Sequence, residues 1–168
     1  MNNATRILLV AACAVALAAC SKKVKEEPQA PASTTPTSTA PVDDGKYGPE
    51  DLDTVACLKT RTVYFDFDQD AVKGEFQTIL ACHAKYLQDR SEARVTLEGN
   101  ADERGSREYN LALGERRGNA VSGAVQAAGG SAGQLTVVSY GEERPVDAGS
   151  SDESWAKNRR VEIVYTAR

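Results

Sequence analysis

Proline is confined almost entirely to one segment of this chain, and that confinement limits how much of the chain can fold. Five of the six prolines lie between residues 21 and 49, where the run PQAPASTTPTSTAP is otherwise rich in Ser, Thr and Ala. Such a composition buries too little apolar surface to offset the entropy of ordering. We therefore expect the folded part to be residues 50–168, which is enough chain for one domain with a single modest core.

The first nineteen residues carry the pattern of a segment that is removed. Arg6 precedes an apolar stretch from Ile7 to Ala19, which is shorter than the roughly 20 residues that span a bilayer. We interpret residues 1–19 as a secretory signal peptide. The stretch ends in LAAC, which resembles the bacterial lipobox, so Cys20 is expected to become a lipidated first residue. The alternative is plain secretion, with Cys20 at this place by chance.

Residues 20–49 are then expected to be a lipidated N-terminus followed by a tether. Multiple acyl chains anchor a protein stably, whereas one chain binds only marginally, and lipoproteins of the lipobox type carry three. Ser21 after the cysteine favours export to the outer membrane. In the extended polyproline form the segment would reach up to roughly 85 Å. The alternative is a tail that has no spacing role.

The charge and cysteine content restrict the chemistry that is open to the chain. The net charge of −4 becomes −5 when Arg6 is removed, which argues against nucleic acid and against adhesion to anionic lipid. Cys57 and Cys82 remain in an exported chain, and we expect them to pair, although two free thiols are the alternative. His83 is the single histidine, so no histidine-based zinc site, and no cofactor, is expected.

Periodicity in residues 62–166 alternates between two and 3.6 residues. The pattern predicts strands at 62–68, 93–99, 134–141 and 159–166, and helices at 72–87, 106–128 and 151–158. Gly129 and Gly130 are expected to end the second helix. In the first strand Val63, Phe65 and Phe67 should share the inner face. Strands that alternate with helices indicate an α/β fold, here a small two-layer sandwich with a four-stranded sheet.

One connection in this pattern carries far more charge than a turn needs. Residues 98–117 read EGNADERGSREYNLALGERR, in which nine of twenty residues are charged. In the simplest reading Asp102 caps the helix, which is worth about 1 kcal/mol, and Arg116 and Arg117 are solvated. In the other reading a carboxylate and a guanidinium form a receptor for a zwitterionic amino acid, with Asp66 as a second anion and Asn110 as donor and acceptor.

Four motifs, in a fixed order along the chain, favour the interpretation of the charged connection as a binding site. VYFDFD, LEGNADERGSREYNLALGERRGNAV, SYGEERP and NRRVEIVY together resemble the OmpA-like peptidoglycan-binding domain, over about residues 60–166. With the lipobox and the proline-rich tether, the chain is similar to the lipidated members of this family in the Tol–Pal system. The resemblance implies a mixed four-stranded sheet in the order βαβαβαβ, with helices packed on it.

The resemblance also implies a site for the peptide stem of peptidoglycan. Asp102 would bind the ammonium of meso-diaminopimelate, and Arg117 its carboxylate. The other implied contacts are the Asn110 amide, an apolar contact from Leu113, and one wall from Phe65 and Asp66. Many relatives have histidine where this chain has Asn100, which puts any pH-dependent role of that position in doubt. Arg159 and Arg160 match the family too, and Arg160 is expected to be structural or peripheral.

The implied function is a non-catalytic outer-membrane lipoprotein that holds the membrane to the cell wall and acts in envelope integrity and division. Its implied partners are peptidoglycan, TolB on the same face as the wall, and also TolA. A wall hydrolase or amidase is the competing class, with Asp66 and Asp102 as a carboxylate pair, but Arg117 nearby would lower their pKa values and remove the general acid. A pure protein-interaction module is the third possibility.

Overall fold

The computed structural model describes residues 45–168. The predicted signal peptide, Cys20 and all of the predicted tether before residue 45 lie outside the described residues. The elements follow one another as α1 (Asp51–Thr54), α2 (Ala56–Lys59), β1 (Thr62–Tyr64), η1 (Gly74–Phe76), α3 (Gln77–Asp89), β2 (Arg94–Asn100), α4 (Arg107–Ala127), η2 (Ala132–Gln134), β3 (Leu135–Gly141), α5 (Asp152–Asn158) and β4 (Arg160–Ala167).

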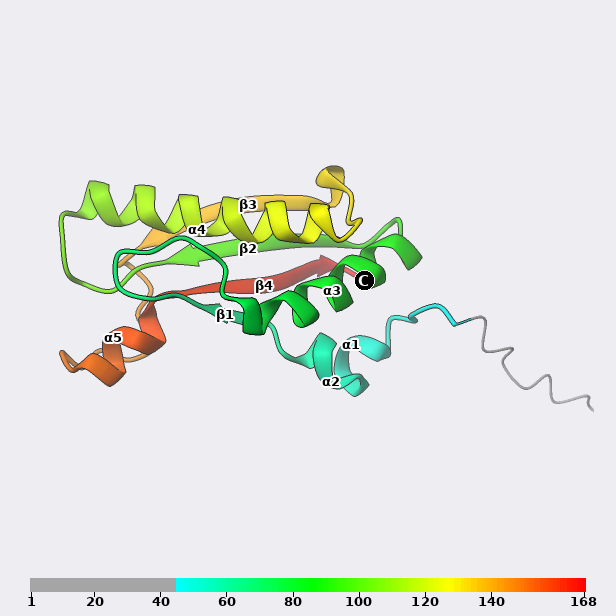
Figure 1. The fold of residues 1–168 in the computed structure, drawn as a ribbon, viewed down its shortest axis with the longest axis horizontal. Coiled ribbons are helices and arrows are strands. Elements are labelled where there is room, and N and C mark those ends of the chain that lie inside the picture. The colour runs from blue at the N-terminus through cyan, green and yellow to red at the C-terminus, as the bar shows by residue number, and fades with distance from the viewer. Residues whose placement is uncertain (1–44) are drawn as a thin grey trace, which may run out of the picture. The chain divides into compact units, whose positions relative to one another are not determined.

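The four strands form one mixed sheet, as Figure 1 shows. Its order is β1-β4-β2-β3, in which β2 and β3 are parallel and the other two pairs are antiparallel. The predicted mixed four-stranded α/β fold is therefore confirmed. The last strand of the chain lies inside the sheet, between the first strand and β2.

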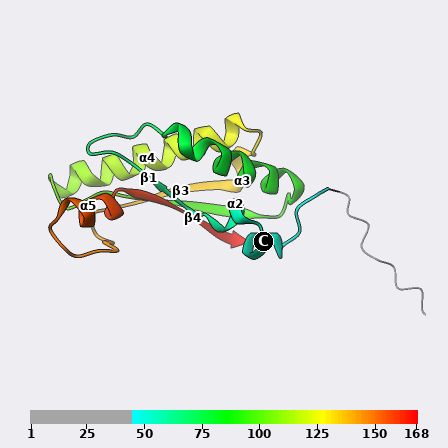
Figure 2. The ribbon, with the colours of Figure 1, turned by 60° about the horizontal axis from the view of Figure 1, so that its bottom comes forward.

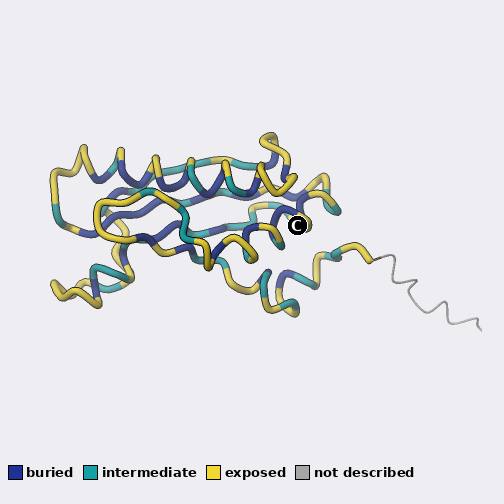
Figure 3. Tube along the Cα trace, viewed as in Figure 1, coloured by how far each residue is buried: buried dark blue, intermediate teal, exposed yellow. Residues whose placement is uncertain are grey.

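Helices α3 and α4 lie on the same face of this sheet, as Figure 2 shows. The core between the two layers joins Leu80 and Leu87 of α3 to Val121 of α4 and to Leu97 and Ile163 of the central strands, all at most 2% exposed. These are positions that the helical and alternating patterns predict to point inward. Figure 3 shows the burial concentrated on the strands and on the inner sides of the two helices.

Helix α4 begins and ends as predicted because both ends carry local signals. The Ser106 hydroxyl accepts a hydrogen bond from the Tyr109 backbone N–H at 3.2 Å, which is N-cap geometry. At the other end Gly129 has a φ of 99°, a left-handed conformation that glycine adopts without strain. The Gly130 N–H then bonds the Val125 carbonyl at 2.9 Å and closes the helix.

Helix α4 also lies unusually close to the sheet. A Cβ atom on Gly99 of β2 would collide with the backbone of Gly114, and one on Gly114 would collide with the Ser139 hydroxyl. Glycine at these two facing positions allows the contact. The Ser139 hydroxyl donates a hydrogen bond to the Leu111 carbonyl at 2.7 Å. The first half of α4 is thereby held directly over the end of β2.

The predicted first strand is too long. Strand β1 ends at Tyr64, and one further backbone bond joins the Phe65 N–H to the Arg159 carbonyl at 2.9 Å. The chain then turns away, with Asp68 at a φ of 55°. Phe67, which the alternation places in the core, is 56% exposed. The loop from residue 65 to 73 curves toward the start of α4 (Figure 1). The helix predicted from residue 72 begins only with η1 at Gly74.

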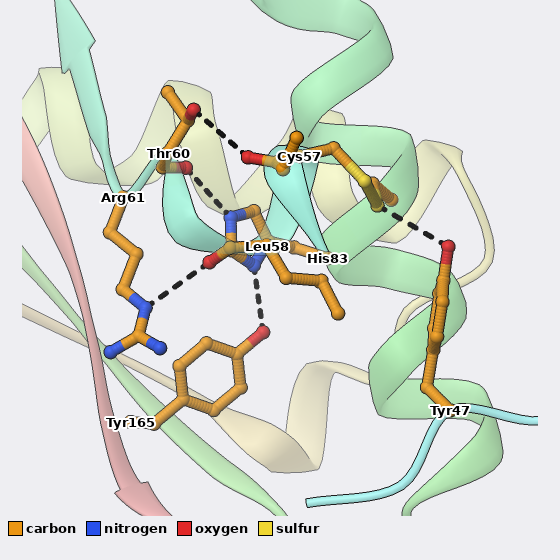
Figure 4. The surroundings of a disulfide bond; sticks show 9 residues. Tyr47, Cys57, Leu58, Thr60, Arg61, His83 and Tyr165 are labelled. Atoms are coloured by element: carbon orange, nitrogen blue, oxygen red, sulfur yellow. Dashed lines mark hydrogen bonds between the residues drawn. A yellow bond between two sulfur atoms is a disulfide. The ribbon is translucent and has the colours of Figure 1, made fainter. Parts of the chain in front are cut away.

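The segment before β1 is attached by a disulfide. Cys57 of α2 is joined to Cys82 of α3, as Figure 4 shows. The Tyr47 hydroxyl lies 3.5 Å from the Cys82 Sγ, and the Tyr47 N–H donates to the Asp89 carboxylate at 2.9 Å. Tyr47 thus packs on the domain three residues before the predicted boundary. The short helices α1 and α2 have no counterpart in the sequence prediction.

His83 is the centre of a buried polar group beside this disulfide (Figure 4). Its Nε2 lies 3.0 Å from the Thr60 carbonyl and its Nδ1 lies 2.7 Å from the Tyr165 hydroxyl. Because a carbonyl only accepts, Nε2 carries the proton and Nδ1 accepts from the tyrosine. The single histidine is therefore a satisfied structural residue. Between residues 45 and 168 no helix has the length and apolar character needed to cross a membrane.

Candidate functional site

A cleft of about 210 Å³ opens where β2 ends and α4 begins. The loop between these elements meets the loop after β1 and the first residues before β4. Its volume lies below the roughly 300–1,000 Å³ of pockets for drug-sized ligands, so it suits a group of amino-acid size. It is lined by Phe67, Asp68, Ala101, Asp102, Arg104, Gly105, Tyr109, Asn110, Leu113, Arg117 and Arg159.

Asp102 is the buried carboxylate of this cleft, with 4% of the residue exposed. Arg104 holds it in bidentate fashion, with Nε 3.1 Å from Oδ1 and Nη2 2.6 Å from Oδ2. The Arg104 backbone N–H donates to Oδ1 at 3.1 Å, and Arg159 Nη1 donates to Oδ2 at 3.2 Å. Asp102 does not cap α4, as one interpretation of the sequence had it, because Ser106 is the N-cap residue.

The protonation of Asp102 follows from these partners. Burial by itself raises the pKa of the carboxyl, but the hydrogen bonds from the Arg104 side chain, the Arg104 backbone and Arg159 outweigh it. The pKa of Asp102 therefore lies below its usual value. At neutral pH the cleft contains an ionised carboxylate that is almost completely removed from water.

Arg117 lines the same cleft but is buried more deeply than a ligand-binding arginine on a helix surface. The residue is 0% exposed. Its Nε donates to the Gln69 carbonyl at 2.8 Å, Nη1 to Asn100 at 2.9 Å and Nη2 to Asp66 at 3.1 Å. A guanidinium has five N–H donors, so two are not committed to these carbonyls.

Burial lowers the pKa of Arg117 to about 10, partly offset by the negative charge of Asp102. The side chain remains charged at neutral pH. Because its three carbonyl partners belong to the loop after β1 and to the end of β2, Arg117 fastens that loop to the sheet. It has a structural role in the cleft whatever the ligand is.

Asn110 and Leu113 project from α4 toward the cleft, as the sequence predicts. Asn110 is 1% exposed and its Nδ2 donates to the Glu142 carboxylate. Leu113 is 5% exposed and adds apolar surface. The Asn110 amide is thus oriented by a carboxylate outside the cleft, which fixes the direction in which its other atoms point.

Phe65 and Asp66 lie differently from the expected wall of the site. Phe65 is 2% exposed and belongs to the core, where its ring faces Arg117. The Asp66 side chain is 68% exposed and pairs with Lys73 at 2.7 Å. Both residues line a neighbouring depression and not the cleft. Because β1 ends early, the second carboxylate of the cleft is Asp68, whose side chain accepts a hydrogen bond from the Tyr109 hydroxyl.

The sequence does not predict that Arg104 and Arg159 are the partners of Asp102 in the cleft. Arg104 stands two positions after Asp102, and this short spacing in a turn is the signal that could have identified it. Arg159 pairs with Asp102 although 57 positions separate them, and no local pattern marks that pairing. With Arg117 they make three arginines against two aspartates in the lining. The cleft therefore has one positive charge in excess, which favours a ligand that carries carboxylate as well as ammonium.

Asn100 and Arg160 lie outside the cleft lining. Asn100 is 2% exposed, its Nδ2 donates to the Glu98 carbonyl at 2.9 Å, and its own carbonyl accepts from Arg117. Arg160 donates to the Glu162 carboxylate at 2.6 Å and to the Arg144 carbonyl at 3.1 Å, which is a structural arrangement. Among residues 45–168 no group of three or more His, Cys, Asp or Glu side chains is placed to hold a metal ion.

Comparison with known proteins identifies the family. The model of the OmpA family matches residues 64–159, a range that contains every residue of the cleft lining. The chain is 40% identical over 165 residues to the peptidoglycan-associated lipoprotein of Pasteurella multocida, and the match covers 98% of this chain and 100% of that protein. This chain belongs to the OmpA family, among the peptidoglycan-associated lipoproteins.

Two solved structures have the same fold. The crystal structure of the peptidoglycan-associated lipoprotein from Burkholderia pseudomallei matches with a TM-score of 0.67 and 43% identity, over 68% of this chain and 98% of that one. The C-terminal domain of MotB from Helicobacter pylori matches with a TM-score of 0.59 over 64% of this chain and 84% of that one, but at 24% identity it shows the fold alone.

Proposed function

We propose that this protein binds the peptide stem of peptidoglycan non-covalently and holds the outer membrane to the cell wall. The observation that supports it best is the cleft, in which an ionised carboxylate and three guanidinium groups surround a space of amino-acid size. Such a set of charges matches meso-diaminopimelate, whose free end has both an ammonium and a carboxylate. The similarity to peptidoglycan-associated lipoproteins adds support.

Within the cleft, Asp102 is the partner of the ligand ammonium. The two N–H groups of Arg117 that its carbonyl partners leave over are the proposed donors to the ligand carboxylate, and Arg159 adds positive charge to the same cleft. Asn110 and Leu113 contact the rest of the diaminopimelate side chain. Phe65 and Asp66 contribute through their backbone carbonyls, which position Arg159 and Arg117.

No chemical step is part of this proposal. A general acid needs a proton near neutral pH, whereas Asp102 is held ionised by two guanidinium groups. The proposed role is that of a binding protein, which gains strength from many anchored copies facing one polymer.

The anchor, the tether and the partners complete the proposal. Residues 1–19 are a signal peptide, Cys20 is the site of lipid attachment, and residues 20–49 lead to the binding domain in the periplasm. TolB, and also TolA, are the proposed protein partners in the Tol–Pal system, with a role in outer-membrane constriction during division. Replacing Cys20 by Ala should release the protein from the membrane fraction, and unchanged membrane association would contradict the anchor.

The decisive test of binding is a titration of the folded domain with two stem peptides that differ at one residue. One contains meso-diaminopimelate and the other contains lysine, which lacks the second carboxylate. We expect the first to bind more tightly by calorimetry. Asp102→Asn should weaken it about 10- to 100-fold, because a hydrogen bond to a charged group is worth about 1.5–3 kcal/mol.

Glu115→Gln is the matched control, since Glu115 is exposed on α4 outside the cleft. It should bind the peptide like the wild type. Equal affinity for the two peptides, or no effect of Asp102→Asn, would contradict the proposed site. Stem fragments released from intact peptidoglycan, detected by mass spectrometry, would instead indicate a hydrolase.

A further inference from the structure

The Arg104 guanidinium covers the one carboxylate that the proposed ligand needs. Asp102 accepts four hydrogen bonds, three from Arg104 and one from Arg159. A carboxylate has about four lone-pair positions. An incoming ammonium can therefore bind Asp102 only when one of the present donors leaves.

Of the two arginines, Arg104 is the one that is free to leave. Its side chain is 31% exposed, and both of its side-chain hydrogen bonds go to Asp102 itself. The Arg159 side chain is 13% exposed and its Nε also donates to the Phe65 carbonyl at 3.0 Å. Moving the Arg159 side chain would also break its bond to the Phe65 carbonyl, whereas moving Arg104 breaks only its bonds to Asp102 and its contacts with two aromatic rings.

The place that Arg104 occupies has the features of a cation site. Its guanidinium carbon lies 4.0 Å from the centre of the Phe67 ring and 4.1 Å from that of Trp155. Cations within about 6 Å of an aromatic ring centre are attracted to its face. Two rings and a carboxylate thus surround one position.

The two rings reach this position from separate elements. Phe67 comes from the loop after β1 and is 56% exposed. Trp155 comes from α5, and its Nε1 donates to the Glu103 carboxylate at 3.0 Å. The Ser150 hydroxyl donates to the same oxygen at 2.7 Å. The Trp155 ring is therefore held in place independently of Arg104 and would remain if Arg104 moved.

We propose that Asp102, Phe67 and Trp155 form a subsite for a primary ammonium group, which Arg104 occupies in the unliganded domain as a built-in competitor. This inference rests on the proposed function and adds the aromatic half of the ammonium site. Ligand binding exchanges one cation for another. The observed association constant is therefore the intrinsic association constant multiplied by the fraction of molecules in which Arg104 has left Asp102. The buried carboxylate is never left without a cation, in either state.

The test compares Arg104→Met with Arg107→Met. Methionine keeps much of the length of arginine but has no charge and no N–H donor. Arg107 is exposed at the start of α4 and pairs with Glu143 outside the cleft, at 2.6 Å. In calorimetric titrations with the diaminopimelate stem peptide, Arg104→Met should bind about three- to tenfold more tightly than the wild type. Arg107→Met should match the wild type. Unchanged or weaker binding by Arg104→Met would overturn the inference.

A second measurement uses the wild-type domain and does not depend on the folding of a variant. The Arg104 Nε–H signal in ¹⁵N NMR should lose its protection from solvent exchange as the peptide saturates the cleft. A signal that stays protected while the Asp102 amide shifts would overturn the inference, because Arg104 would then remain in place.

The two proposals can fail separately. If no form of the domain binds the stem peptide, the proposed function fails, and 1,5-diaminopentane becomes the probe of the subsite. Tighter binding of this diamine to Arg104→Met than to the wild type would still support the subsite. Equal binding would overturn it.

Discussion

The domain buries polar side chains at two ends, and it satisfies them in opposite ways. At the cleft, Asp102 is ionised and lies among guanidinium groups, of which those of Arg104 and Arg159 are partly exposed. Beside the disulfide, His83 is equally buried, but it is neutral and bonded to a carbonyl and a hydroxyl. One end is a charged cluster closed by a movable arginine, and the other is a neutral cluster closed by a covalent bond.

The difference shows what each arrangement permits. A buried charge needs another charge close by, and a partner that is itself a flexible side chain can be exchanged for a ligand group. A neutral hydrogen-bonded pair needs no counter-charge, and its partners can belong to the backbone and to the core. The charged end is thus suited to exchange, and the neutral end to rigidity. The following predictions test that contrast.

The largest effect on stability is expected for Arg117, which lines the cleft and also fastens the loop after β1 to the sheet. Arg117→Met should lower the free energy of unfolding by about 3–5 kcal/mol, because three backbone carbonyls lose a charged donor and each unsatisfied buried acceptor costs about 1–3 kcal/mol. Urea unfolding followed by circular dichroism measures this change. Arg116→Met is the control, since Arg116 is exposed, and its contacts with Asp70 and with the Tyr109 ring both lie at the surface. It should change stability by less than about 0.5 kcal/mol.

If Arg117→Met is as stable as Arg116→Met, the fastening role of Arg117 is wrong and its burial has another explanation. The prediction also bears on binding assays. Loss of peptide binding in an Arg117 variant would not by itself identify a ligand contact, because the loop after β1 would be released.

Removal of the disulfide should affect stability but not the cleft. The bond between Cys57 and Cys82 closes a loop of 25 residues, so replacing both cysteines by serine should lower the free energy of unfolding by about 3.5 kcal/mol in the chain-entropy model. Affinity for the stem peptide should remain within about twofold of the wild type, within the usual additivity of distant sites. A large loss of affinity in a folded double variant would contradict the independence of the two ends.

The smallest effects are expected in the pH dependence of the free energy of unfolding, to which the two ends of the domain contribute in different pH ranges. Burial lowers the pKa of His83, with a smaller opposing effect from its bond to Thr60. The unfolded chain then binds a proton that the folded chain does not, so stability is full above the unfolded pKa of about 6.5 and falls as pH decreases toward the folded pKa. His83→Gln should remove this slope, which is at most about 1.4 kcal/mol per pH unit.

Asp102 should act in a lower window. Its pKa is lowered in the folded domain, so its contribution is present above an unfolded pKa of about 3.9 and is lost as pH falls below that value. Asp102→Asn should flatten the stability curve only there, as measured by unfolding from pH 7 to pH 2.5. If Asp102→Asn changed the slope between pH 5 and 6.5, the assignment of the two windows would be reversed.

The sequence predicts the parts of the fold whose causes are local. Helix α4 is delimited by Ser106 and Gly129 because a cap and a left-handed glycine act within a few residues. The inward positions of β2 and β4 follow from alternation. The end of β1 cannot be predicted from alternation. Phe67 continues the alternating pattern, but its ring stacks on Arg104. The sequence does not distinguish a phenylalanine in the core from one that covers a cation.

The residues expected to form the site come together only in part. Asp102, Asn110, Leu113 and Arg117 line one cleft, whereas Phe65 and Asp66 line a neighbouring depression. That they bind a ligand stays a prediction. The burial of Arg117 has no mark in the sequence, because its partners are backbone carbonyls. The pairing of Arg159 with Asp102 depends on the position of β4 beside β2, which only the assembled sheet provides.

Strand β2 begins five residues after Asp89, which accepts a hydrogen bond from the Tyr47 N–H, and it ends at the cleft. It is hydrogen-bonded to β4 on one side and to β3 on the other, and its two ends meet opposite ends of the domain (Figure 1). The ladder bonds of β2 run across or obliquely to the strand on both of its sides. A force applied along β2 would therefore be shared by these bonds.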